Sequence, residues 1–221
     1  MKKETFDKIP SNIKIFLKKQ GIEELRPSQE KSIEKGLFDN SKNQLVCSPT
    51  ASGKTLVAEL SMLDTILNQN KRVLYIVPLK ALASEKYREF SDLYGDSFRV
   101  RVSIGELQNE KYNYDYELMI LTAEKLDSLL RHDKGVLNKV GLVIADEIHL
   151  INDEKRGPTL EILLSLFKSK YPSIRMIGLS ATVGNAEELS EWLEADLIQD
   201  EWRPVELHHY VSYNNEISRY K

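Results

Sequence analysis

Short apolar runs alternate with longer amphipathic stretches along most of the chain. The apolar runs are rich in Val, Ile and Leu, and they cover residues 44–47, 72–77, 99–104, 118–121, 141–145 and 174–178. Most of them are apolar at every central position, which is typical of strands that are buried on both faces of a sheet. The pattern therefore predicts one central, mostly parallel sheet.

The stretches between these runs carry apolar residues at helical spacing. They predict helices over residues 54–69, 79–93, 123–131, 158–168 and 185–194, and two helical segments, 11–20 and 27–35, precede the first strand. Strands and helices that alternate in this way predict an α/β fold with helices on both faces of the sheet. Ligands bind such folds at the carboxyl ends of the strands, so the residues that follow each strand are the first candidates for chemistry.

The chain of 221 residues contains no internal repeat and no flexible linker, and its length suits one sizeable domain. We predict that residues 1–200 form this domain, with the N-terminal helices in residues 1–36. Residues 203–213 have the alternating character of an extended segment. Residues 201–221 are therefore expected to lead toward a further domain.

Composition narrows the class of protein. The chain is 41% hydrophobic and 29% charged, which is typical of a globular protein and not of a disordered one. Its net charge of −3 provides no overall basic field, so any nucleic-acid binding must come from local patches. The single cysteine, Cys47, excludes an internal disulfide, and no apolar run is long enough to span a membrane. We expect a cytoplasmic protein.

The strongest local signal is the run Ser48-Pro49-Thr50-Ala51-Ser52-Gly53-Lys54-Thr55. It follows a predicted strand and opens a predicted helix, which is the setting of a P-loop and argues against a chance sequence in an ordinary loop. Gly53 lets the backbone approach a phosphate, and successive N–H groups face the anion. Lys54 supplies a charge for the β- and γ-phosphates of ATP, and the Thr55 hydroxyl is placed for Mg²⁺. The motif departs from its usual form at Ser48, where glycine is usual.

A second candidate site follows the run 141–145, where Asp146 and Glu147 come in succession. Asp146 is predicted to hold Mg²⁺ through water, and Glu147 to orient and polarise the attacking water. Two carboxylates at a strand end are usually just solvated, but here they follow a P-loop in the order that P-loop ATPases show. His149 alone would indicate a packed core side chain, and its position beside the carboxylates favours a coupling role.

Two weaker motifs complete the residue-level interpretation. Ser180 and Thr182 follow the run 174–178, and their hydroxyls could bond the catalytic carboxylates, although such residues are common at strand ends. Gln29 carries an amide that can both donate to and accept from an adenine edge. Without further context, Gln29 is only an exposed polar residue in a helix that begins with Pro27.

These motifs form an ordered set with two others. In chain order the set is Gly21 to Gln29, Ser48 to Thr55, Pro78-Leu79-Lys80-Ala81-Leu82, Thr122-Ala123-Glu124-Lys125, Asp146-Glu147-Ile148-His149 and Ser180-Ala181-Thr182. The set resembles the first motor (RecA-like) domain of superfamily 2 DExH-box helicases, over nearly the whole chain. Residues 78–87, 146–158, 178–182 and 202–205 make it most similar to the Ski-like group and to archaeal repair helicases that act at stalled replication forks.

The resemblance implies an ATP-dependent DNA helicase that moves 3′ to 5′ and uses ATP with Mg²⁺. Gln29 would read adenine, with Arg26 near the base, and His149, Ser180 and Thr182 would couple hydrolysis to strand movement. Single-stranded or forked DNA would be the partner of a monomer. Contacts with the nucleic-acid backbone are implied at Pro78, Lys80, Ala81, Thr122, Glu124, Lys125, Arg156, Ser103 and Gly105. The family pattern matches poorly at residues 106–109, and Lys80, Lys125 and Arg156 are alternatively solvated charges at helix starts.

The family's second motor domain is expected to follow Tyr213 and to bring an arginine to the ATP. Such an arginine raises the rate by roughly 10³-fold or more, so we expect these 221 residues alone to bind ATP·Mg²⁺ weakly, to hydrolyse it slowly and not to separate strands. An RNA helicase of the same group is the nearest alternative, because a groove that tracks the backbone reads phosphate and shape. If the protein were a nucleotide switch or a kinase, the motifs at Pro78 and Ser180 would have no role. If it were a non-catalytic interaction module, the presence of Lys54 and Glu147 would be unexplained.

Overall fold

The centre of the molecule is a sheet of seven parallel strands in the order β3-β4-β2-β5-β6-β1-β7. The computed structural model describes residues 2–39, 42–104, 115–205, 208, 210–213 and 216–219. The strands are β1 (Asn43–Cys47), β2 (Arg72–Val77), β3 (Val100–Ser103), β4 (Leu118–Thr122), β5 (Val140–Ala145), β6 (Arg175–Ser180) and β7 (Ala195–Gln199). The predicted fold class is confirmed, and the first six strands overlap the six apolar runs of the sequence.

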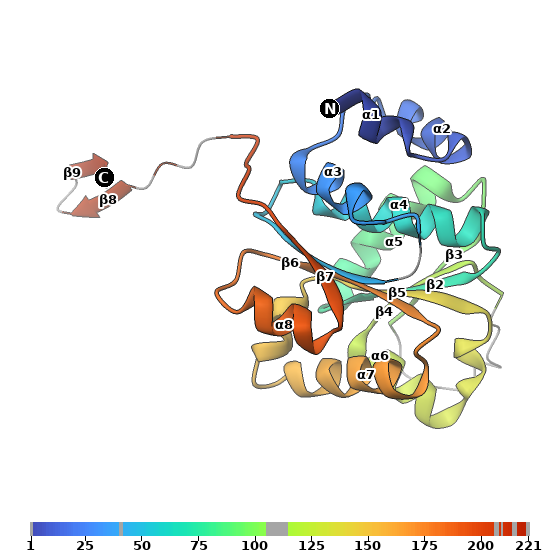
Figure 1. The fold of residues 1–221 in the computed structure, drawn as a ribbon. Coiled ribbons are helices and arrows are strands. Elements are labelled where there is room, and N and C mark those ends of the chain that lie inside the picture. The colour runs from blue at the N-terminus through green and yellow to red at the C-terminus, as the bar shows by residue number, and fades with distance from the viewer. Residues whose placement is uncertain are drawn as a thin grey trace.

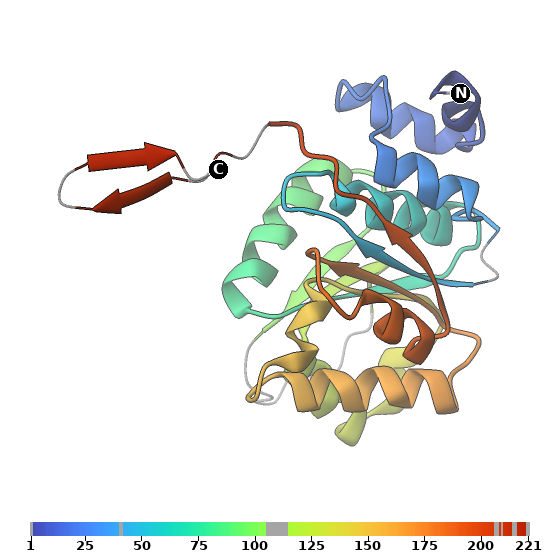
Figure 2. The ribbon, with the colours of Figure 1, turned by 60° about the vertical axis from the view of Figure 1, so that its left-hand side comes forward.

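Helices cover both faces of the sheet (Figures 1 and 2). One face carries α1 (Lys2–Asp7), α2 (Ser11–Lys19), α3 (Pro27–Glu34), α4 (Lys54–Leu67) and α5 (Lys80–Tyr94). The other carries α6 (Ala123–His132), α7 (Gly157–Lys170) and α8 (Ala186–Trp192), with the 3₁₀ turns η1 (Lys134–Leu137) and η2 (Ile148–Asn152). Among the described residues, none of these helices is both long and apolar enough to cross a membrane.

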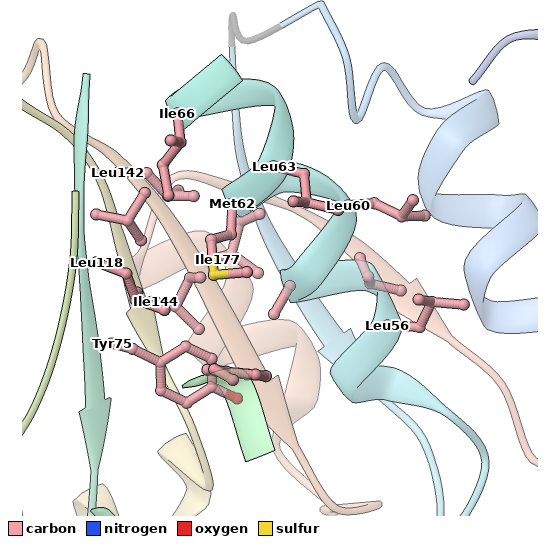
Figure 3. Packing of buried hydrophobic residues seen from close by; sticks show 14 of the residues in the cluster. Leu56, Leu60, Met62, Leu63, Ile66, Tyr75, Leu118, Leu142, Ile144 and Ile177 are labelled. Atoms are coloured by element: carbon pink, nitrogen blue, oxygen red, sulfur yellow. The ribbon is translucent and has the colours of Figure 1, made fainter. Parts of the chain in front are cut away.

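Each face of the sheet has its own apolar core. Figure 3 shows the core under α4, where Met62 and Ile66 lie on the side of the helix that faces Leu142 and Ile144 of β5. The residue between the last two, Val143, belongs to the opposite core under α6 and α7. Because successive side chains of a strand point to opposite faces, a run that is apolar throughout fills both cores. Each such fully buried side chain contributes about 1.5–3 kcal/mol relative to exposure.

Two segments differ from the sequence-based expectation. Strand β7 was not predicted, because it lies at the sheet edge and carries Asp196 and Gln199 among half-exposed positions. The segment after residue 200 is extended only in part, since β8 (Tyr210–Tyr213) and β9 (Glu216–Arg219) form an antiparallel hairpin. Figure 1 shows this hairpin apart from the main body.

Candidate ATP and nucleic-acid sites

The strand order sorts the predicted site residues into two groups along the carboxyl edge of the sheet. Strands β5, β6 and β1 are neighbours, and they are followed by Asp146, Ala181 and Ser48. Strands β3, β4 and β2 are also neighbours, and they end at Ser103 and Thr122 and just before Pro78. The residues predicted for the phosphates and metal of ATP therefore lie at one half of the edge, and most of those predicted for nucleic acid lie at the other. Arg156, which follows β5 and η2, is the exception.

The loop between β1 and α4 has the backbone geometry of a phosphate cradle. Ala51 and Gly53 both adopt left-handed backbone conformations, with φ of 65° and 91°. Lys54 begins α4 and is 7% exposed, so its charge is held against the loop. Turns of this kind aim successive N–H groups at one point, and the helix N-terminus adds its positive end. The loop can thus hold the phosphates of a nucleotide.

The loop carries Ser48 at the position where a P-loop usually has its first glycine, and the contacts of Ser48 are compatible with this substitution. The Ser48 hydroxyl is buried and lies 2.7 Å from the hydroxyl of Ser52, so a side-chain hydrogen bond closes the loop. The Ser48 N–H donates to the carbonyl of Ser180 on the neighbouring strand at 3.2 Å. Ser48 is not among the residues with positive φ, so its backbone does not require glycine. Pro49 is buried behind the loop and Thr50 is exposed.

Gln29 and Arg26 hold the cradle from the side of α3. The Gln29 side-chain oxygen accepts from the Arg26 N–H at 2.8 Å, and its Nε2 donates to the Gly53 carbonyl at 2.9 Å. Arg26 Nη1 donates to the Ala51 carbonyl at 2.6 Å. Gln29 is only 3% exposed, and its side-chain amide is used to bond the P-loop. Contact with adenine by Gln29 and Arg26 stays a prediction.

Asp146 lies directly after β5 in a half-buried position. Its Oδ2 accepts a hydrogen bond of 3.1 Å from the Tyr75 hydroxyl, and its Oδ1 accepts one of 2.9 Å from the Glu147 N–H. Burial and then the nearby charge of Glu147 raise the pKa of the Asp146 carboxyl, while the Tyr75 hydrogen bond and Lys86 lower it. Such a fixed carboxylate suits a divalent cation that supplies the missing positive charge.

The donor set fits Mg²⁺ rather than a softer metal. Thr55 at the start of α4 and Asp146 at the end of β5 offer only oxygen atoms, which hard cations prefer. Among the described residues, no group of three or more His, Cys, Asp and Glu is placed to hold a metal. Mg²⁺ keeps several waters and binds with substrate phosphates, so two protein oxygens are sufficient.

Glu147, His149 and Ala181 connect β5 with β6. Glu147 has a left-handed backbone (φ 49°, ψ 43°), which turns its half-exposed carboxylate out of the strand direction. The Glu147 Oε2 lies 3.3 Å from Nδ1 of His149, and the Ala181 N–H donates to the same nitrogen at 3.4 Å. The imidazole of His149 therefore lies between the Glu147 carboxylate and the backbone at the end of β6, and its coupling role stays a prediction.

The two hydroxyls of the third motif do not contact the carboxylates. Ser180 Oγ is buried without a hydrogen-bond partner in the described part of the chain, and Thr182 is exposed. The link to the carboxylates is made instead by the backbone of Ala181. The coupling roles of Ser180 and Thr182 stay predictions.

The nucleic-acid half of the edge combines exposed and buried candidates. Lys80, Ala81 and Glu124 are exposed, whereas Lys125 is half-buried. Thr122 is 4% exposed, and its hydroxyl accepts from the Lys125 N–H at 3.3 Å, so it caps α6. Thr122 thus stabilises the start of α6, and little of its surface is accessible for contact with nucleic acid. Ser103 is half-buried at the end of β3, and Gly105 lies outside the described residues.

One pocket joins the two halves of the edge. It is a small hollow of about 20 Å³, and its lining includes Pro78, Glu124, Asp146, Glu147 and Arg156. Three of these residues are nucleic-acid candidates, and two are the predicted metal ligand and catalytic carboxylate. The fold therefore brings both sets of candidates to one hollow.

Sequence reasoning missed the polar residues that support the site from within. Tyr75 is fully buried in β2 and is the partner of Asp146. Glu59 of α4 is also buried, the Tyr94 hydroxyl of α5 donates to it, and Gln20 Nε2 at the end of α2 donates to Tyr94 at 3.0 Å. Burial raises the pKa of Glu59 to about 7. A polar residue within an otherwise apolar run was the only available signal.

A model of the DEAD/DEAH box helicase family matches residues 26–189 of the chain. The chain belongs to the DEAD/DEAH box helicase family. The match begins at Arg26 and ends beyond Thr182, so this helicase-family segment contains both halves of the carboxyl edge. The predicted resemblance is thus confirmed at the level of the family.

Several longer proteins are similar to this DEAD/DEAH box chain. ATP-dependent DNA helicase Hel308 of Methanocaldococcus jannaschii is 53% identical over 207 residues, which cover 91% of the chain and 17% of the relative. The Hel308 of Methanococcus vannielii is 49% identical over 214 residues, which cover 94% of the chain and 28% of the relative. A crystal structure of the DUF1998 helicase MrfA bound to DNA matches with a TM-score of 0.71 and 26% identity, over 88% of the chain and 30% of that protein. The chain spans less than a third of each of these proteins.

Proposed function

We propose that this chain is the ATP-binding motor domain of an ATP-dependent DNA helicase. The observation that carries the proposal is the division of the carboxyl edge. The P-loop follows β1, and Asp146 and Glu147 follow β5, with only β6 between these two strands. Pro78, Lys80 and Glu124 lie past β2 and β4, which are the next strands along the same edge. A domain with ATP on one half of an edge and nucleic acid on the other is suited to couple the two.

The chemistry follows from the positions of the side chains. Lys54 would bind the β- and γ-phosphates, and Thr55 and Asp146 would hold Mg²⁺, which would supply positive charge against the developing negative charge. Glu147 orients a water and accepts its proton as the water oxygen bonds to the γ-phosphorus. The bond from that phosphorus to the bridging oxygen breaks, and ADP and inorganic phosphate leave. A left-handed Glu147 backbone sets the direction of its carboxylate.

The proposed partner is single-stranded or forked DNA. The named relatives are DNA helicases, and the related crystal structure contains DNA. We propose that the whole protein is a cytoplasmic monomer that moves 3′ to 5′ and unwinds DNA at stalled forks. A second motor domain of the same protein would form the opposite wall of the ATP cleft and supply an arginine.

Calorimetric titration with ADP and ATP in Mg²⁺ tests the nucleotide half of the proposal. We expect Lys54→Ala to weaken binding at least tenfold, because it removes the charge that faces the phosphates. Glu147→Gln keeps the shape of the side chain but cannot accept a proton, so it should bind ATP nearly as well as the wild type and lose turnover. ATP binding that is indifferent to Lys54 would overturn the assignment.

Anisotropy of labelled single-stranded DNA tests the other half. Lys80→Ala should weaken binding several-fold and lower the slope of log affinity against log salt by about 0.7, because one phosphate contact is lost. Lys71 is the matched control, since it is an exposed lysine at the opposite end of β2. Equal effects of Lys80→Ala and Lys71→Ala would exclude the proposed edge. An RNA strand of the same sequence that stimulates ATPase activity better than DNA would indicate an RNA helicase instead.

A further inference from the structure

A short strap, residues 199–202, crosses the nucleotide side of the molecule after β7. The Asp200 N–H donates to the carbonyl of Cys47 at 3.1 Å, which continues the pairing of β7 with β1 past the end of both strands. Asp200 Oδ2 lies 2.6 Å from Lys31 Nζ, and the same Nζ donates to the Gln199 carbonyl at 2.9 Å. The strap is therefore fixed to the strand that enters the P-loop and to α3.

The strap places the indole of Trp202 against Arg26. The backbone N–H of Trp202 donates to Asp200 Oδ1 at 2.7 Å, which folds the strap back on itself. The guanidinium of Arg26 lies over the indole, 5.5 Å from the ring centroid. On its other side Arg26 bonds the Ala51 carbonyl at 2.6 Å. The guanidinium is thus held by an aromatic ring against one of its faces and by a hydrogen bond from its Nη1 to the backbone of the P-loop.

We propose that Trp202 is a positioning residue for recognition of a purine base. This inference rests on the proposed function, because it assumes that a nucleotide occupies the P-loop. Gln29 and Arg26 both bond the loop from α3, so a base that lies on the α3 side of that loop would meet them. A guanidinium plane attracts the π face of a base, and the indole keeps that plane from rotating.

The geometry favours this role over a purely structural one. Trp202 is 39% exposed, so a large apolar ring is kept at the surface and contributes little to either core. The Asp200–Lys31 pair and the Asp200–Cys47 hydrogen bond already hold the strap without the indole. The ring is therefore available for Arg26, and it lies one side chain away from the phosphate loop.

Fluorescence of the 221-residue chain tests the proposal, because Trp192 and Trp202 are its only tryptophans. In Trp192→Phe, all tryptophan emission comes from Trp202. We expect ADP·Mg²⁺ and ATP·Mg²⁺ to change this emission, and inorganic tripolyphosphate to compete for the P-loop without changing it. In calorimetry, Trp202→Ala should weaken ADP about three- to tenfold and leave tripolyphosphate binding unchanged, whereas Trp202→Phe should restore most of the affinity.

The outcomes separate the inference from the proposed function. Trp202→Ala that weakens ADP and tripolyphosphate equally, or that weakens neither, would overturn the inference while Lys54-dependent binding still supports an ATP site. If the wild-type chain binds ADP and tripolyphosphate with no dependence on Lys54, both the ATP site and the role of Trp202 are wrong. Thermal unfolding of Trp202→Ala near the wild-type temperature would show that the loss of affinity is local.

Discussion

The Tyr75 hydroxyl donates a hydrogen bond of 3.1 Å to Asp146 Oδ2 across two neighbouring strands. Partners behind a metal ligand fix its orientation, and their loss typically costs about 10–100-fold in metal affinity. We therefore expect Tyr75→Phe to raise the Mg²⁺ concentration required for half-maximal ADP binding by about tenfold. Titration of Mg²⁺ at fixed ADP, followed by calorimetry, measures this shift.

Tyr116→Phe is the matched control for that experiment. Tyr116 is also fully buried, and its hydroxyl donates to the Val136 carbonyl at 2.8 Å, away from the nucleotide side. Both variants should lose about 1–2 kcal/mol of stability, because each leaves a buried acceptor without its donor. Only Tyr75→Phe should change the Mg²⁺ requirement, and the same requirement in both variants would contradict the role assigned to Tyr75.

Gly53 is the position in the P-loop that tolerates a side chain least. A Cβ at this residue would lie 2.5 Å from Nε2 of Gln29, and its φ of +91° disfavours other residues. Gly53→Ala should lower the free energy of unfolding by about 1–2 kcal/mol and weaken ADP binding severely, because either the loop or Gln29 must move. Urea unfolding and calorimetry measure the two effects. Gly184→Ala is the control, since a Cβ there has no neighbour within 4 Å and we expect little change.

The buried carboxyl of Glu59 predicts a pH-dependent stability. Burial raises its pKa from 4.5 to about 7, against the hydrogen bond from Tyr94 and the charge of Lys86. Between these values the folded chain holds a proton that the unfolded chain has released. The free energy of unfolding should therefore fall as pH rises through this range, by about 3 kcal/mol in total.

Glu59→Gln should remove that dependence, because an amide does not titrate. The variant should be more stable than the wild type at pH above about 7, and the difference should shrink toward pH about 4.5. Urea unfolding at several pH values gives both curves. Glu161→Gln, which changes an exposed carboxylate of α7, should leave the wild-type curve unchanged. Parallel curves for Glu59→Gln and wild type would show that Glu59 does not titrate in this range.

Cys47 provides a probe of opening at the nucleotide site. It is fully buried at the end of β1, and burial raises the pKa of its thiol. A disulfide reagent should therefore react with the native chain only after local opening. ADP·Mg²⁺ at ten times its Kd should slow the reaction about tenfold, since bound nucleotide must leave first. In Lys54→Ala the same ADP concentration should protect Cys47 much less, and equal protection would argue against nucleotide binding next to β1.

The sequence was sufficient to predict an element or motif where a single physical requirement determines which residue type can stand at a position. Strand β5 is apolar throughout because both of its faces are buried, and the glycine and lysine of the P-loop are required by phosphate. Strand β7 has an exposed edge, and its mixture of Asp196 and apolar residues carries no strong pattern. Burial on both faces therefore made β5 predictable from its sequence, whereas the partial exposure of β7 left it without a recognisable pattern.

The pairings between distant residues could not be predicted in this way. Tyr75 and Asp146 are 71 positions apart, and only the adjacency of β2 and β5 brings them together. Gln29 could be identified as a polar helix residue, and its bond from the Arg26 N–H is local to the start of α3, but its bond to Gly53 depends on how α3 docks against the P-loop. Candidate site residues could be named from the sequence, whereas the side chains that contact them could be identified only from the fold.

The position of β1 in the sheet affects when the sheet can form during synthesis of the chain. It is the first of the sheet strands to be synthesised, yet its neighbours, β6 and β7, are the last two. Pairing of such distant segments is slow, because a long loop must close before any contact forms. On the ribosome, the phosphate-binding loop stays without its flanking strands until residue 199 has emerged. Nucleotide binding by a nascent chain would therefore report that the entire sheet has been completed.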